Sequence, residues 1–147
     1  MFNKRGFVIT ILLAFCQHNS YAEVAETAFM ATEKTDVYYI LLGFIPETSS
    51  QIELKAPAIA ENKAVVPINI KTQLPNPTRV SIIADNNTHP LVAVFDSSGF
   101  TSDSDSHLHI STRIKLERAS TITVIVETSD GAYTASTHVK VTSSGGC

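Results

Sequence analysis

The chain has 147 residues, with 11 Lys and Arg against 14 Asp and Glu, so its formal net charge at pH 7 is −3. This length suits one domain with a single buried core. The acidic balance excludes the class of proteins that bind nucleic acid through a clustered basic face, and no nucleic-acid partner is expected. The two cysteines, Cys16 and Cys147, lie near opposite ends of the chain.

Residues 1–22 are predicted to be a signal peptide. The basic pair Lys4-Arg5 precedes an apolar run, residues 7–15, that is too short to span a bilayer. Residues 20–22 then have the small-x-small pattern of a cleavage site. We therefore expect export, cleavage after Ala22, and no membrane association of the mature chain.

Cleavage after Ala22 would leave Cys147 as the only cysteine of an exported protein. A lipid anchor on Cys16 is disfavoured, because Phe15 stands where lipid attachment needs a small residue. A lone thiol in an oxidising compartment is typical of an intermolecular or reactive cysteine.

Residues 23–46 are predicted to be an N-terminal helical segment. The pattern is interrupted near Lys34, and Gly43 and Pro46 end it. We expect this helix to pack on the domain or on a partner. Its apolar residues recur at spacings that place them on one helix face: Ala25, Ala28, Phe29, Val37, Ile40, Leu41 and Phe44.

Residues 47–142 alternate apolar and polar side chains, which is typical of β-strands. Turn residues separate the strands about every ten positions. This spacing indicates an all-β fold, an immunoglobulin-like antiparallel β-sandwich. The predicted strands cover residues 52–56, 66–70, 80–84, 91–95, 108–116, 122–126 and 133–141.

Two of these strands carry a more specific prediction. Pro67 has no backbone N–H, so its strand is expected at a sheet edge. The run 91–95 is apolar at every position, which predicts burial on both faces, either centrally in a sheet or beneath a partner.

Three histidines are the only candidates for a metal site. His107 and His109 share one strand face, and His138 lies on the last strand, but no third ligand can be assigned. A solvated polar face is favoured, so we expect no metal and no cofactor. Residues 103–105 lack the glycine and glutamate of a calcium loop.

Residues 143–147 are predicted to be a flexible C-terminal arm that ends in Cys147. Gly145 and Gly146 populate both signs of φ and would act as its hinge. Extended, the arm would carry the sulfur on the order of 15 Å. The thiol has no base beside it, so it is a poor catalyst but a suitable covalent handle. From the arm alone, a spare cysteine that forms accidental disulfides is equally supported.

Several segments, taken in order, match one family. They are LKAPAIAENKAVVP at 54–67, STRIKL at 111–116, SDG at 129–131, VKVT at 139–142 and GGC at 145–147. In this combination the chain resembles the SoxY family, the sulfur-carrier subunits of the bacterial periplasmic thiosulfate-oxidising Sox system.

The resemblance implies a periplasmic carrier without enzymatic activity of its own. Cys147 would be the attachment point for sulfur intermediates, with Gly145 and Gly146 as the arm hinge. A c-type cytochrome pair would load thiosulfate, a hydrolase would release sulfate, and a sulfane dehydrogenase would oxidise the remaining sulfur. A separate SoxZ-like chain would complete a heterodimer, with residues 91–95 and the N-terminal helix as candidate contacts.

Three features depart from the family pattern. The family arm usually ends Gly-Gly-Cys-Gly-Gly, and a carboxylate directly on Cys147 is expected to oppose thiolate formation. Lys63 stands where glycine is common, and a positive φ there would strain a lysine. The leader has only Arg5 of the twin-arginine pair found in many family members, which leaves general secretory export equally open.

Two alternatives to the carrier remain. One is an exported structural or adhesion module whose Cys147 forms an interchain disulfide. The other is a thiol-transfer enzyme, which is disfavoured because the mature chain would have no resolving cysteine and no assigned base.

Overall fold

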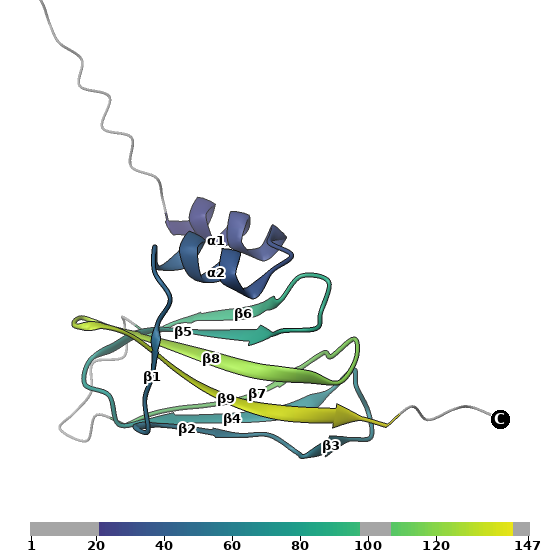
Figure 1. The fold of residues 1–147 in the computed structure, drawn as a ribbon. Helices are drawn as coiled ribbons and strands as arrows, with labels where there is room; N and C mark the ends of the chain where they lie inside the picture. Colours follow the sequence, from purple (N-terminus) through teal and green to yellow (C-terminus); the bar gives the residue numbers. More distant parts are fainter. Residues whose placement is uncertain (1–20, 98–106, 143–147) are drawn as a thin grey trace, which may run out of the picture.

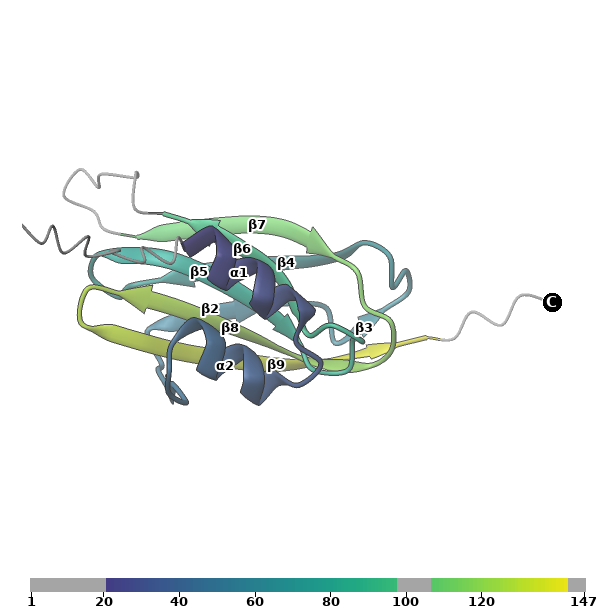
Figure 2. The same ribbon diagram turned by 90° about the horizontal axis from the view of Figure 1, so that it is seen from above.

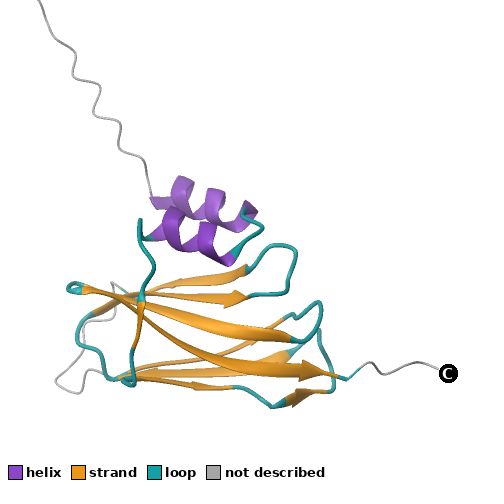
Figure 3. Cartoon of the chain, viewed as in Figure 1, coloured by secondary structure: helices purple, strands orange, loops and turns teal. Residues whose placement is uncertain are grey.

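The structure is a computed structural model, and it describes residues 21–97 and 107–142. Two β-sheets pack face to face, and two short helices cover the outer side of the larger sheet (Figure 1). Strands make up about half of the described chain (Figure 3). The predicted β-sandwich with an N-terminal helical segment is therefore confirmed.

The larger sheet has the strand order β1-β9-β8-β5-β6, and β3 also pairs with β9. The long strands pair antiparallel, whereas the two-residue strands β1 and β3 run parallel to β9. Its strands are β1 (Glu47–Thr48), β3 (Ile59–Ala60), β5 (Pro77–Ala84), β6 (Leu91–Asp96), β8 (Ser120–Thr128) and β9 (Gly131–Val141). The smaller sheet, order β2-β4-β7, consists of β2 (Ile52–Lys55), β4 (Val66–Thr72) and β7 (Leu108–Ile114).

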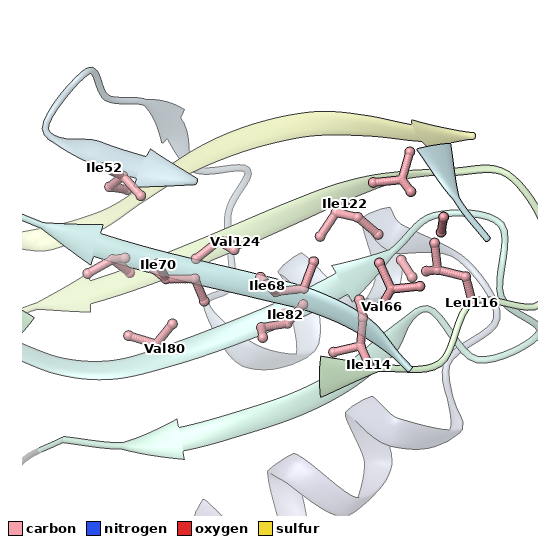
Figure 4. Close-up of a cluster of buried hydrophobic side chains, with 14 of the residues drawn as sticks. Ile52, Val66, Ile68, Ile70, Val80, Ile82, Ile114, Leu116, Ile122 and Val124 are labelled. Carbon is pink, nitrogen blue, oxygen red and sulfur yellow. The ribbon is translucent and has the colours of Figure 1, made fainter. Parts of the chain in front are cut away.

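The main core lies between the two sheets. Alternation along β4 turns Val66, Ile68 and Ile70 inward, while Pro67 and Lys71 face solvent. Figure 4 shows these side chains among isoleucines and valines of the larger sheet, such as Ile82. Because each buried branched side chain contributes about 1.5–3 kcal/mol relative to exposure, the period-two pattern is sufficient to define this core.

The N-terminal segment forms two helices instead of one: α1 (Tyr21–Met30) and α2 (Lys34–Leu41). The chain reverses between them, near the predicted interruption, so both helices lie side by side on the sheet (Figure 2). Lys34 Nζ donates to Asp85 Oδ2 at 2.6 Å, which ties the start of α2 to the residue that follows β5. The interruption predicted near Lys34 is therefore a break between two helices, and the residues predicted to share one helix face are divided between them.

Two features at the N-terminus bear on export. Of the predicted signal peptide, only Tyr21 and Ala22 are described, and they form the first turn of α1. Cleavage after Ala22 remains a prediction. Neither described helix combines the length and apolar content that a membrane crossing requires.

Pro67 does not mark an edge strand, because β4 lies between β2 and β7. The reason is the offset of the strands. β2 pairs with β4 only from Asn69 to Thr72, whereas Pro67 pairs with Arg113 of β7. The proline therefore lies where β4 has a neighbour on one side only, and a local edge suffices.

The apolar strand β6 is not central, and its side chains from Val92 to Phe95 are only partly buried. It is the last strand of the larger sheet. Leu91 and Val94 pack in the cluster beneath the helices, while Val92 and Phe95 pack against the main core. Both faces of β6 thus pack against the chain's own helices and second sheet, although only Leu91 is fully buried.

Candidate functional site at the root of the C-terminal segment

The predicted site residues Gly145, Gly146 and Cys147 lie outside the described residues. The structure does describe their attachment point, since β9 ends at Val141 and Thr142 follows it. We call residues 140–142 the arm root. Their contacts determine where the last five residues of the chain begin.

The arm root extends beyond the strand that supports the rest of β9. Pairing with β8 ends at Val139, and the next two residues pair with β3 instead (Figure 1). The Lys140 N–H donates to the Ala58 carbonyl at 3.0 Å. Thr142 donates to the Ala60 carbonyl from its N–H at 3.2 Å and from Oγ1 at 3.5 Å. The root therefore starts from a hydrogen-bonded position.

The turn that follows β3 is hydrogen-bonded to Leu116 and Glu117, which supports β3. Ala60 is buried in the main core. The Leu116 N–H donates to the Lys63 carbonyl at 2.7 Å, and Lys63 Nζ donates to the Glu117 carbonyl at 3.4 Å. Asn76 is the non-glycine residue with positive φ in the described ranges, so Lys63 carries no such strain and the concern about this position was wrong.

The loop that contains Asn87 and Thr88 forms hydrogen bonds at the same end of the sandwich. The Asn87 side chain accepts from the Glu117 N–H at 2.8 Å and donates to the Lys115 carbonyl at 3.0 Å. Thr88 donates to Glu117 Oε2 from Oγ1 at 2.8 Å and from its N–H at 3.0 Å. Because these donors favour the ionised carboxylate, the Thr88 side-chain bond and then its backbone bond lower the pKa of Glu117.

Replacing Thr88 with valine is expected to raise the pKa of Glu117 toward its ordinary value, because the hydroxyl donor is lost. A carboxyl with a lowered folded-state pKa stabilises the fold above its unfolded pKa, and this contribution is lost as the pH falls through the folded pKa. Wild type and Thr88→Val should therefore differ in stability near neutral pH and converge in acid. NMR titration of the Glu117 carboxyl measures the pKa, with Thr35→Val on the exposed side of α2 as control; an unchanged pKa would contradict the assignment.

His138 does not come together with His107 and His109. His109 lies on β7 of the smaller sheet with its Nε2 3.3 Å from Ser111 Oγ, and His138 lies on β9 of the larger sheet with its Nδ1 3.4 Å from Thr121 Oγ1. His107 and His109 line one surface hollow together with Lys71. Within residues 21–97 and 107–142, no group of three or more His, Cys, Asp or Glu side chains could hold a metal ion.

A partly buried charged pair was not identified from the sequence. Arg79 Nη1 donates to Glu127 Oε2 at 2.8 Å, and the Arg79 guanidinium carbon lies 3.2 Å from the centre of the Tyr21 ring. Burial raises the pKa of Glu127, although the Arg79 charge opposes this shift. Tyr21 would be removed by the predicted cleavage after Ala22. Arg79 and Glu127 join β5 to β8, far along the sheet from the arm root, and we assign this pair a structural role.

β3 was also missed, although it holds the arm root. Two residues are too few for an alternating pattern, and Ile59-Ala60 precede an ordinary turn. The available signal was the small side chain of Ala60. It is compatible with close packing, but it does not identify β9 as the strand that pairs with β3.

Together, the fold and the root define a β-sandwich protein whose last long strand leads directly into its C-terminal residues. The model of the family described as sulfur oxidation protein SoxY matches residues 41–147. The solved sulfur carrier protein SoxY from Chlorobium limicola f. thiosulfatophilum is 32% identical, with a TM-score of 0.58, and the match covers 74% of this chain and 94% of that one. The chain belongs to the SoxY family.

Other similarities are weaker. A variant of the superoxide reductase (neelaredoxin) from Ignicoccus hospitalis is 12% identical with a TM-score of 0.48, and the match covers 65% of this chain and 81% of that one. A second neelaredoxin structure from that organism has the same identity and TM-score and covers 63% and 80%. Values this low carry no argument. No curated protein matches the chain.

Proposed function

We propose that this protein is a non-enzymatic carrier that holds sulfur intermediates covalently on Cys147 during thiosulfate oxidation. Membership of the SoxY family over residues 41–147 is the observation that carries the proposal. The solved relative is a sulfur carrier protein by its description, and its similarity covers most of both chains. The hydrogen-bonded arm root is consistent with this role, because a carrier arm needs a defined origin.

The proposed chemistry begins with the Cys147 thiol. A bond forms between its sulfur and the terminal sulfur of thiosulfate, the thiol proton is released, and an electron pair passes to a c-type cytochrome. The product is a cysteine S-thiosulfonate. Water then cleaves its sulfur–sulfonate bond in a hydrolase, which releases sulfate and a proton and leaves a persulfide. A sulfane dehydrogenase oxidises that outer sulfur with oxygen from water and accepts its electrons.

The length of the arm would bring this sulfur to the active sites of the partner enzymes. Gly145 and Gly146 act as the hinge, and five extended residues beyond Thr142 span about 16 Å. The range is centred on the arm root, because hydrogen bonds to Ala58 and Ala60 hold residues 140 and 142. Partner enzymes would therefore supply the base and the electrostatic field that a thiol on an arm lacks.

The carrier would act in the periplasm after removal of residues 1–22, as a heterodimer with a SoxZ-like chain. Its other partners would be the cytochrome, the hydrolase and the dehydrogenase of the Sox pathway. Neither nucleic acid nor a membrane is part of this function.

Intact-mass measurement of protein isolated from the periplasm tests the carrier role. We expect additions that match one sulfur atom, a sulfonate or a thiosulfonate, and we expect fragmentation to place them on Cys147. A chain that begins at Glu23 would support the cleavage site. A disulfide-linked dimer without any adduct would instead favour the structural module.

A further inference from the structure

The bond that the predicted leader cleavage would break lies inside α1. This helix spans Tyr21–Met30, so cleavage after Ala22 would cut within its first turn. The Glu23 carbonyl, directly beyond that bond, accepts a hydrogen bond from Thr27 Oγ1 at 3.0 Å. The backbone on both sides of the bond is therefore helical in the full chain.

Tyr21 holds the start of this helix on the sheet. The guanidinium carbon of Arg79 lies 3.2 Å from the centre of the Tyr21 ring. Arg79 is itself paired with Glu127 at 2.8 Å, and these two side chains are only 20% and 16% exposed. The Tyr21 hydroxyl is buried as well. Because a cation–π contact is strongest where water is excluded, the first turn of α1 is held against fraying.

The rest of α1 is part of the second buried cluster. Ala28 is fully buried together with Ile83, Leu91 and Ile125 of the larger sheet. The helix lies over β6 (Figure 2). Unwinding its first turn would break the contact between Tyr21 and Arg79, and lifting the whole helix would also uncover this cluster.

Such a bond is a poor substrate for a peptidase. Proteases cut exposed segments that can extend, and they cut a folded region only through its local opening. An α-helix rises about 1.5 Å per residue and an extended strand about 3.3 Å, so the first turn must unwind before the bond can enter an active site. The side chains of Ala22 and Glu23 are exposed. The obstacle is therefore the helical backbone and the Tyr21 contact.

We propose that the leader is removed before α1 docks on the sheet, and that the chain is exported unfolded by the general secretory route. The proposal rests on the proposed function only for the removal of residues 1–22. It decides between the two export routes that a leader with Arg5 alone leaves open. In a precursor that folds before export, Tyr21 protects the bond from cleavage.

The test compares cleavage of full-length precursors by a purified bacterial signal peptidase. The unfolded reference is Ile82→Asp/Val124→Asp, which places two carboxylates at fully buried positions of the main core. Circular dichroism confirms which precursors are folded, and N-terminal sequencing identifies the bond that is cut. We expect the reference to be cut after Ala22 and the folded wild type to be cut at least about 10-fold more slowly, since only its opened molecules are substrates.

Tyr21→Ala tests the protecting contact. Residue 21 is the middle position of the small-x-small pattern, so this substitution leaves the recognition pattern intact. It should raise the cleavage rate of the folded precursor about 3-fold or more, as expected for loss of a cation–π contact, and leave that of the unfolded reference unchanged.

Arg79→Lys provides a second variant outside the cleavage site. It keeps a positive charge beside Glu127 but removes the planar guanidinium from the Tyr21 ring, and it should also speed cleavage of the folded precursor. Lys71→Ala, at an exposed position of the smaller sheet, is the control and should leave the rate unchanged.

Export in a bacterial host tests the route. Depletion of the motor ATPase of the general secretory translocase should cause the full-length precursor to accumulate, whereas loss of the twin-arginine translocase should not. Export that stops only with the twin-arginine translocase would overturn the proposal. Equal cleavage rates for the folded wild type and the unfolded reference would do the same, as would a folded Tyr21→Ala precursor that is cut no faster than wild type.

The carrier function fails or holds independently of these results. A reference that is never cut after Ala22 would overturn both the leader prediction and this proposal, without bearing on Cys147. If Cys147 carries sulfur in a chain that is exported folded, only this proposal fails. If the leader is removed before folding and Cys147 never carries sulfur, only the carrier function fails.

Discussion

Replacing Cys147 with serine is expected to reduce thiosulfate oxidation to background in a system reconstituted with the partner enzymes. A hydroxyl cannot form the sulfur–sulfur bond on which the proposed loading step depends. The substitution lies beyond Thr142, the last described residue. Sulfate production measures activity, and thermal unfolding should be the same for both proteins.

A displaced thiol provides the matched control. Ser144→Cys in the Cys147→Ser background restores a thiol three residues nearer the arm root, which shortens its reach by about 10 Å. We expect this variant to accept sulfur poorly, because the thiol would no longer reach a recessed site. Undiminished oxidation by Cys147→Ser alone would contradict the carrier assignment.

Replacing Leu116 with alanine is expected to destabilise the fold by about 2–5 kcal/mol, the range for large-to-small changes in a packed core. Leu116 is fully buried in the main core, and its N–H donates to the Lys63 carbonyl behind β3. The change would leave a cavity next to the turn that supports the arm root. Urea unfolding gives the free energy, and the melting temperature should fall on the order of 10 °C.

Lys115→Ala is the control for this position. The Lys115 side chain is exposed, and its carbonyl bond from Asn87 does not depend on the side chain. We expect a change within about 0.5 kcal/mol. A cost below about 1 kcal/mol for Leu116→Ala would show that the site collapses to fill the cavity. At low temperature the folded variant should still acquire sulfur on Cys147, which separates stability from chemistry.

The seven long strands could be predicted because their signal is local. Alternation such as Val66, Ile68 and Ile70 places one set of side chains on one face whatever lies opposite. The two shortest strands could not be predicted. β1 and β3 exist because β9 passes beside them, with Glu47 opposite Tyr133 and Ile59 opposite Lys140.

Local rules also predicted the wrong sheet position for two strands, β4 and β6. The rule for Pro67 concerns a whole strand, but the actual environment changes along β4 where β2 ends. The apolar run in β6 correctly indicated packing on both faces, but its residues after Leu91 are only partly buried. The two environments predicted for this run were a central position and a position beneath a partner. Neither is an edge strand that packs against the chain's own helices.

Sequence alone was enough for the sandwich, the break in the helical segment and the family resemblance, because each depends on the identity and spacing of neighbouring residues. It was also the source of the prediction that Cys147 carries the cargo. Tertiary structure was needed to find how β3 and the turn at Lys63 hold the arm root, and that Met30 and Tyr39 stay exposed on the two helices. These features arise from contacts between residues distant in the chain, which no local pattern encodes.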